Sequence, residues 1–223
     1  YSYQIEQNGI VIRKEWNNFP RCLFLSGTPR KKYRINDCWK NIPEQLYLYS
    51  SAFTEALLSH PERVDIPQGY KKGLIIKAYA PRINKDYCLA ICGNQKALGN
   101  WDPEKAVLMS DSNFPEWQVE LDASKLKYPL EYKFILCHKQ ERKIDCWEKN
   151  PNRYLADPEI KTNETLVISD RYVYFDIPIW KGAGIAIPVF SLKSEKSFGV
   201  GDFGDLKLMI DWAVNTHQKV IQI

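Results

Sequence analysis

The sequence has no long apolar run and few residues of the kind that usually bind metals. No stretch of the 223 residues approaches the roughly 18 consecutive apolar residues of a membrane-spanning helix. The chain has three histidines, and none of its six cysteines forms a CxxC pair, so no zinc-ligand spacing is present. We therefore expect no membrane segment, no bound metal and no cofactor.

A strong charge of either sign is also absent. The 31 Lys and Arg residues nearly balance the 27 Asp and Glu residues, which leaves a net charge of +4. This balance excludes the basic footprint of nucleic-acid binding, and we expect neither nucleic acid nor membrane as a partner. No secretory signal is recognisable, and the chain begins without Met at Tyr1. We expect a missing upstream segment, reduced thiols and a cytoplasmic location.

Aromatic residues are abundant, at 13% of the sequence. Between about residues 72 and 177 they fall in short runs such as GLIIKAYA, DYCLAICG and LEYKFILCH, each bounded by Gly, Pro, Asn or Asp. A spacing of roughly 8 to 12 residues between such runs is typical of an antiparallel, immunoglobulin-like β-sandwich. The pattern changes after residue 180, where GIAIPVF, a helical stretch over 205–217 and KVIQI predict strand, helix and strand with parallel pairing.

An internal repeat divides the chain into three parts. Residues 1–25 align with residues 130–157, and the matched pairs are Tyr3 with Tyr132, Glu15 with Glu148, and Arg21 with Arg153. We predict the second half of a first module with a linker over 1–65, a complete second module over 66–178, and a different fold over 179–223.

Two tryptophans stand on turns of the complete module. Gly99 and Asn100 lift Trp101 out of the polar loop LGNWDPEKA, and Trp147 ends a strand before a Pro-Asn-Arg turn. In LEYKFI, Glu131 and Lys133 alternate with aromatic residues, so both face the side of the strand opposite the core. Flat indoles beside a few fixed polar groups can grip the apolar faces and the hydroxyl rim of a pyranose.

A purely structural interpretation of these residues is open. Trp101 and Trp147 would then plug the ends of the core. Glu131 and Lys133 would form a solvated ion pair, which contributes under about 1 kcal/mol.

The stretch from about 74 to 177 resembles the starch-binding modules of carbohydrate-binding family 20. The motifs that carry the resemblance are CGNQKALGNWDPEKAVLM, the tryptophan at 117, LEYKFI and CWEKNPNRYL, in this order. The resemblance implies a main α-glucan site and a second sugar site, built from the following residues: Trp101 and Trp147 with Lys133, Asn152, Glu131 and Glu148 for the main site, and Trp117 with Phe114 for the second. Trp117 is equally compatible with a place in the core.

The first copy departs from this pattern. In the alignment Gln4 takes the place of Lys133, and Lys14 takes the place of Trp147. We therefore predict that the N-terminal half-module binds glucan weakly or not at all.

The C-terminal stretch contains Gly199-Val-Gly-Asp-Phe-Gly204, which has the spacing of a dinucleotide fingerprint. Eight residues separate it from the preceding strand, and Asp202 and Asp205 would place negative charge where phosphates bind. The segment instead resembles the opening of a glycoside hydrolase family 77 enzyme, whose fold is a (β/α)₈ barrel. The predicted fold class is thus mainly β, with β-sandwich starch-binding modules followed by the first strand-helix-strand of an α/β barrel.

Together the resemblances imply the α-glucan-binding, N-terminal part of a 4-alpha-glucanotransferase. Such an enzyme transfers α-1,4-glucan segments by a retaining mechanism with two carboxylates. In the family those carboxylates lie on later barrel strands, beyond Ile223, so we expect no catalytic residue in this chain and no turnover by it. A stand-alone starch-tethering module and an immunoglobulin-like protein-interaction domain are the alternative functions.

Overall fold

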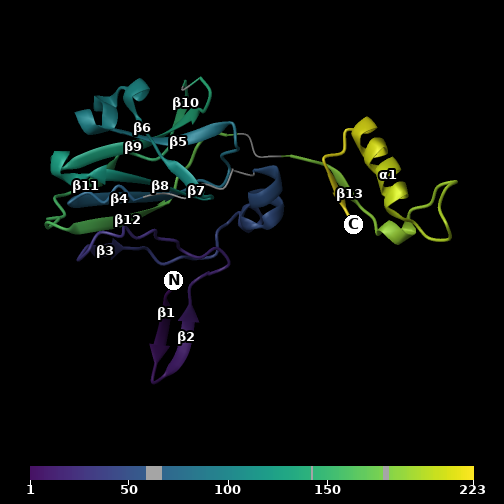
Figure 1. Ribbon diagram of the computed structural model, residues 1–223, viewed down its shortest axis with the longest axis horizontal. Helices are drawn as coiled ribbons and strands as arrows, with labels where there is room; N and C mark the ends of the chain where they lie inside the picture. The colour runs from purple at the N-terminus through teal and green to yellow at the C-terminus, as the bar shows by residue number, and fades with distance from the viewer. Residues whose placement is uncertain (59–66, 142, 178–180) are drawn as a thin grey trace. The chain divides into compact units, whose positions relative to one another are not determined.

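The computed structural model of the chain describes residues 1–58, 67–141, 143–177 and 181–223. The chain forms two compact units, residues 1–177 and 178–223, and each is described by itself. The first unit is built around two five-stranded sheets, which Figure 1 shows as layers of a sandwich. The three-part division of the chain stays a prediction.

The first sheet is wholly antiparallel. Its strand order is β10-β9-β5-β6, and β11 also pairs with β9. The strands are β5 (Tyr87–Gly93), β6 (Val107–Leu108), β9 (Leu130–His138), β10 (Ile144–Trp147) and β11 (Arg153–Leu155).

The second sheet has the order β3-β12-β4-β8-β7. Its strands are β3 (Lys32–Asn36), β4 (Lys72–Tyr79), β7 (Ser110–Asn113), β8 (Glu116–Asp122) and β12 (Glu164–Tyr172). Strand β12 runs parallel to both β4 and β3, which the prediction of an antiparallel sandwich missed. Strand β3 comes from the N-terminal part of the chain, so that part and the second module share a sheet.

The core lies between the two sheets. Alternate residues of β9 point into it, and Tyr132 and Phe134 are buried at 2% and 0% exposure. From the other sheet, Leu74, Ile76 and Trp117 contribute side chains that are fully enclosed. The period of two in LEYKFI therefore predicts which side of the strand faces the core.

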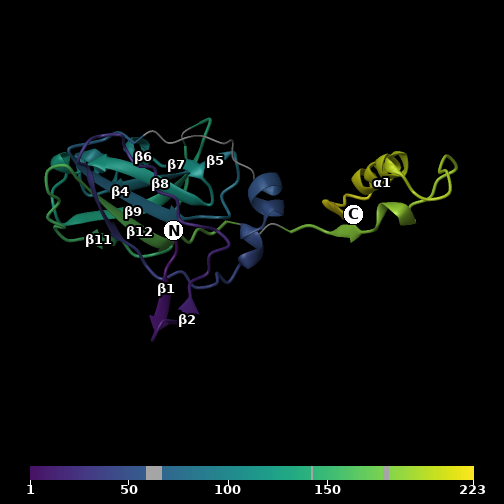
Figure 2. The same cartoon turned by 60° about the horizontal axis from the view of Figure 1, so that its bottom comes forward.

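The N-terminal hairpin extends away from the two sheets in both views of the molecule (Figures 1 and 2). Strands β1 (Gln4–Gln7) and β2 (Ile10–Lys14) pair through a two-residue turn at Asn8 and Gly9, which have φ values of 52° and 77°. Such a left-handed Asn-Gly pair is the favoured turn for a tight hairpin.

The remaining elements of the first unit are short helices. They are η1 (Leu46–Tyr49), η2 (Ala52–Leu57), η3 (Lys96–Trp101), η4 (Pro103–Lys105) and η5 (Ala123–Lys125).

The second unit is a strand-helix-strand. Strands β13 (Gly184–Ala186) and β14 (Val220–Gln222) pair in parallel, with η6 (Val189–Ser191) and α1 (Phe203–Asn215) between them. The Asp202 carboxylate caps α1 by accepting from the backbone N–H groups of Gly204 and Asp205 at 2.7 and 3.1 Å. Asp205 completes a capping box by accepting from the Asp202 N–H at 3.0 Å. The glycine-rich stretch thus forms a loop and a helix cap.

Among the described residues, no helix combines the length and apolar character that crossing a membrane requires. Within the same residues, no group of three or more His, Cys, Asp or Glu side chains is placed to hold a metal ion. The six cysteines are present as free thiols.

Candidate functional site

The turn that carries Trp101 has an unusual backbone. Gly99, Asn100 and Trp101 follow one another in left-handed conformation, with φ values of 83°, 51° and 61°. Position 99 requires glycine because a Cβ there would meet the Lys105 carbonyl oxygen at 2.9 Å. A bulky side chain such as Trp costs on the order of 1 to 3 kcal/mol in this conformation, so the surrounding structure must impose it.

Hydrogen bonds on both sides of the turn impose this conformation. The Gln95 carbonyl oxygen accepts from the Asn100 N–H at 3.0 Å. The Gln95 side chain makes two bonds of 2.9 Å to the backbone of Lys127, which ties the turn to the next loop. After the turn, the Asp102 carboxylate accepts from the Glu104 N–H and pairs with Lys105. Its hydrogen bond with Lys105 holds the pKa of Asp102 below the usual value.

Trp147 is positioned by the residue that follows it. The Glu148 carboxylate accepts from the Phe134 N–H at 2.9 Å and from Arg153 at 3.1 and 2.9 Å. The Glu148 N–H in turn donates to the Phe134 carbonyl oxygen at 3.0 Å. Burial alone would lower the pKa of Arg153, but its hydrogen bond to Glu148 and the charges of Asp170 and Glu148 together outweigh burial and raise it. This buried network fixes the end of β10, where Trp147 stands.

Strand register brings the predicted residues to one face of the first sheet. Lys133 lies opposite Cys92, and Ile135, two residues further along β9, lies opposite Trp147. Directly opposed residues share a face, so Lys133 and Trp147 are both on the outer face. The Asp102 carbonyl oxygen lies 3.6 Å from the Cys92 Sγ, which places the Trp101 turn over the same face.

The two indoles meet on this face. The ring centroids of Trp101 and Trp147 are 6.3 Å apart, and the ring planes are inclined by 47°. Both side chains are half-buried, as are Glu131 and Lys133, whereas Asn152 is exposed on the following turn. In the described part of the chain, Glu131 and Lys133 form no ion pair with each other, unlike the purely structural interpretation.

The structure contradicts the prediction that Glu148 contacts a sugar. The resemblance implied a sugar contact, but its side chain is 0% exposed, and its two oxygens bind Arg153, the Phe134 N–H and Asn150. A carboxylate enclosed in this way cannot reach a ligand. Glu148 is a positioning residue for Trp147.

The structure also contradicts the prediction of a second sugar site at Trp117 and Phe114. Trp117 is completely buried in the core, and its Nε1–H donates to the Ala80 carbonyl oxygen at 3.3 Å. Phe114 packs edge-on against it, with ring centroids 6.2 Å apart. Trp117 is therefore a core residue, as the second interpretation predicted. Trp117 offers no exposed indole on which a sugar could stack.

Tyr154 lies on the same outer face as Glu131, which the sequence interpretation missed. It lies directly opposite Glu131 in the pairing of β11 with β9, and 63% of the residue is exposed. The alternation of half-buried Arg153 with exposed Tyr154 is the signal that identifies its outward position.

The arrangement fits the binding of a neutral, ring-shaped, hydroxylated molecule. The indole faces offer stacking surfaces. The Lys133 ammonium donates hydrogen bonds, the Glu131 carboxylate accepts them, and the Asn152 amide can do both. We assign no catalytic role to these residues.

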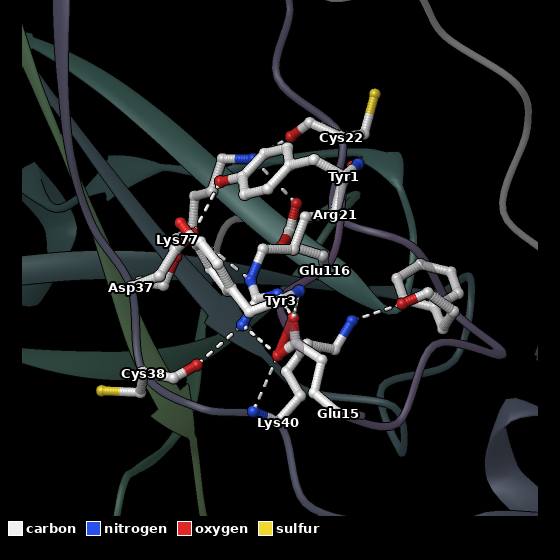
Figure 3. Close-up of polar contacts among 12 residues, drawn as sticks. Tyr1, Tyr3, Glu15, Arg21, Cys22, Asp37, Cys38, Lys40, Lys77 and Glu116 are labelled. Carbon is white, nitrogen blue, oxygen red and sulfur yellow. Dashed lines mark hydrogen bonds and ion pairs between the residues drawn. The ribbon is translucent and has the colours of Figure 1, made fainter. Parts of the chain in front are cut away.

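The buried network around Glu148 occurs a second time in the N-terminal segment (Figure 3). There Glu15 pairs with Arg21 and accepts from the Tyr3 N–H at 2.7 Å. Arg21 also lies 3.4 Å from Asp37, which accepts from the Tyr1 hydroxyl at 2.7 Å. Burial opposes ionisation of Glu15, but its hydrogen bonds, first that from Arg21, hold its pKa below the usual value.

The second copy has the same contacts in the same order. Arg153 lies 3.8 Å from Asp170, which accepts from the Tyr132 hydroxyl at 2.6 Å. The Arg153 guanidinium lies 4.8 Å from the centre of the Phe134 ring, as the Arg21 guanidinium lies 5.0 Å from that of Tyr3.

This correspondence corrects the alignment of the repeat. Tyr3 is the counterpart of Phe134, not of Tyr132, because each donates its N–H to the glutamate of its network. Tyr1, two residues earlier, then stands in the place of Tyr132. Ser2 therefore stands in the place of Lys133. The pairing of Gln4 with Lys14 matches that of Ile135 with Trp147, so two polar residues replace the apolar pair.

The comparisons with known proteins agree with this description. The starch binding domain family (CBM_20) matches residues 76–167, and the 4-alpha-glucanotransferase family (Glyco_hydro_77) matches residues 187–223. The chain is therefore similar to a family 20 starch-binding domain over 76–167 and to glycoside hydrolase family 77 over 187–223.

Two curated relatives are 4-alpha-glucanotransferases. The enzyme DPE2 of Oryza sativa subsp. japonica is 27% identical over 235 residues, which cover 99% of this chain and 24% of that protein. The enzyme of Chlamydia trachomatis serovar D is 42% identical over 40 residues, 18% of this chain and 8% of that protein. The chain thus spans a quarter or less of the length of either relative.

Solved structures with some likeness include a family 20 module and a glucoamylase. The family 20 module of a maltotetraose-forming amylase from Pseudomonas saccharophila has a TM-score of 0.36 at 18% identity, covering 44% of this chain and 99% of that one. The glucoamylase of Hormoconis resinae has a TM-score of 0.40 at 14% identity, covering 54% of this chain and 20% of that one.

Proposed function

We propose that this chain is the α-glucan-binding part of a 4-alpha-glucanotransferase. The observation that carries the proposal is the pair of indoles, Trp101 and Trp147, on the outer face of the starch-binding domain beside Lys133. The ligand is a starch-like, glycogen-like or maltodextrin chain of α-linked glucose.

Binding combines stacking with hydrogen bonds at the sugar rim. Each indole that stacks on a glucose ring contributes on the order of 1 to 3 kcal/mol, by analogy with aromatic stacking on nucleotide bases. Lys133 donates to hydroxyl oxygens, Glu131 accepts from hydroxyl groups, and Asn152 does both. The strained Trp101 turn supports this role, because backbone strain concentrates where a side chain must be held for a ligand.

The second unit is proposed as the first strand-helix-strand of the catalytic barrel. The parallel β13–β14 pair around α1 supports this, since a (β/α)₈ barrel repeats this unit. Asp202 and Asp205 cap α1, so neither is assigned as a catalytic carboxylate. We further propose that glucan transfer by a retaining mechanism belongs to the whole enzyme and that it works in the cytoplasm, which is compatible with the free thiols of this chain.

The test is migration through native gels cast with and without amylopectin. We expect amylopectin to retard the wild-type chain and the control variant Trp212→Ala, whose tryptophan is 46% exposed on α1. Trp101→Ala and Trp147→Ala should each lose most of the retardation while circular dichroism shows an intact fold. Equal retardation of all four proteins, or none of the wild type, would refute the assignment of the site.

A further inference from the structure

A cleft in the first unit lies away from the paired indoles. It has a volume of about 620 Å³ and lies where the chain around residues 38–49 meets the ends of β4 and β12. That size is within the roughly 300 to 1,000 Å³ of small-molecule sites. Its lining shares none of the residues Trp101, Lys133 and Trp147.

Aromatic side chains from both copies of the repeat line the cleft. Trp16, Trp39 and Tyr49 come from the N-terminal part, and Tyr172 and Tyr174 come from the second module. Tyr174 is 55% exposed, whereas the others are half-buried. An aromatic lining of this kind offers several flat faces to rings with apolar C–H groups.

The arginines at the buried end of the lining are paired within the protein, whereas Arg82 donates only to the neutral Gln45 side chain at 2.8 Å and Glu44 is exposed. Arg21 and Arg153 belong to the two buried carboxylate networks. The Lys40 ammonium lies 5.5 Å from the ring centres of both Trp16 and Tyr79 and donates to the Phe19 carbonyl oxygen. Figure 3 shows the N-terminal network with Lys40 beside it. Because both buried arginines already have carboxylate partners, the buried part of the cleft favours a neutral ligand over an anionic one.

Polar groups at the edge are held in fixed positions. The Arg13 guanidinium lies 5.1 Å from the centre of the Trp39 ring and also donates to the Asn41 side-chain oxygen at 3.3 Å. Asn150 donates to Glu148 at 3.2 Å and to the Tyr172 carbonyl oxygen at 3.4 Å. Fixed amides beside aromatic faces suit a hydroxylated ring, since little ordering is then required on binding.

We propose that this cleft is a separate carbohydrate-binding site that takes a short segment of neutral oligosaccharide. The chemical class of the ligand, α-linked glucose, rests on the proposed function. The N-terminal copy, which lacks the paired indoles, contributes Trp39 and Asn41 to this cleft, so the second module alone forms only part of it.

Hydrogen exchange with and without maltoheptaose tests the two sites separately. We expect slower exchange in segments 39–45 and 172–175 for the cleft, and in 98–105 and 144–152 for the indole face. Protection at 39–45 and 172–175, whether or not the indole face responds, supports the cleft. Protection confined to the indole face overturns the cleft and leaves the proposed function intact. Saturating ligand with no protection anywhere overturns both.

Calorimetry of variants supplies a second test. In the double variant Trp101→Ala/Trp147→Ala, we expect one remaining class of sites for maltoheptaose, and adding Trp39→Ala should weaken it about tenfold. Tyr174→Ala removes a largely exposed ring and is not expected to affect folding, and Trp212→Ala is the matched control. No remaining binding in the folded double variant, or no effect of both Trp39→Ala and Tyr174→Ala, would refute the proposal.

Discussion

Replacing Glu148 by Gln should both destabilise the domain and weaken glucan binding. Glutamine keeps the volume and one acceptor oxygen, but it puts an N–H group toward Arg153 and Asn150, which are themselves donors. Breaking a buried ion pair by removing one partner costs about 3 to 5 kcal/mol. Asp170 remains 3.8 Å from Arg153 and offsets part of the lost charge, so we expect about 3 kcal/mol, near the lower end of that range.

The loss is measured as the free energy of unfolding in urea, followed by fluorescence and compared at equal m-values. Glucan affinity should fall as well, because Trp147 loses the neighbour that fixes the end of β10. A stacking contribution on the order of 1 to 3 kcal/mol predicts about a tenfold loss or more.

The repeat provides a matched control in the same chain. Glu15→Gln removes the corresponding carboxylate from the network of Arg21, Tyr3 and Asp37, and it should also destabilise the chain. Its effect on the glucan affinity of the indole face should stay within about twofold, the scatter expected for independent sites. A change in unfolding free energy under about 1 kcal/mol for Glu148→Gln would mean that the pair behaves like a surface pair. Equal losses of glucan affinity at the indole face in both variants would refute the positioning role.

Two further predictions concern backbone conformation and pH. Gly99→Ala should lower both glucan affinity and the free energy of unfolding, because the φ of +83° and a backbone oxygen at 2.9 Å oppose a Cβ at this position. Gly9→Ala is the control, since Gly9 has a similar φ of +77° but open space around it. It should cost only about 1 kcal/mol of stability and leave glucan affinity unchanged. Hydrogen bonds from Ser194, the Asp202 N–H and Ser197 hold the pKa of Asp205 below its usual value. The ionised Asp205 therefore stabilises α1 above about pH 4, and this stabilisation is lost as the pH falls through the lowered pKa. The NMR shift of the Asp202 amide can be followed from about pH 5 to about pH 2, a range that includes the usual carboxyl pKa. This shift should show the transition in the wild type and not in Asp205→Asn. A wild-type transition at the usual carboxyl pKa would contradict the prediction.

Local patterns in the sequence predict much of the indole face. The alternation in LEYKFI puts Lys133 and Glu131 opposite the core because side-chain direction in a strand depends only on the neighbouring residues. Gly99 and Asn100 predict the turn that lifts Trp101 for the same reason, since their left-handed preference is intrinsic. The strand-helix-strand after residue 180 also follows from local periodicity, and the parallel β13–β14 pair confirms it.

Contacts between distant residues could not be predicted in this way. In the stretch CWEKNPNR, Glu148 has the appearance of a surface acid. It is buried because its carboxylate accepts from Arg153 and from the N–H of Phe134, 14 residues earlier. Trp117 looks as available as Trp101, but β8 places it between two sheets whose strands are far apart in sequence. The parallel pairing of β3 with β12 joins residues some 130 positions apart, and no local pattern specifies it.

The two copies of the buried network separate framework from ligand face. In both copies a glutamate, an arginine, an aspartate and a tyrosine tie the end of one strand to its neighbour through the same pairs of residues. The side chains that point outward from this frame differ completely, since Lys14 and Gln4 occupy the positions of Trp147 and Ile135. The frame needs its residues to be buried and paired, whereas the outer face needs them only to reach solvent. Sugar binding can therefore be lost from one copy at little cost to its fold. For the same reason, we expect the glutamate-arginine network to accompany the frame of such a module whether or not the module binds glucan.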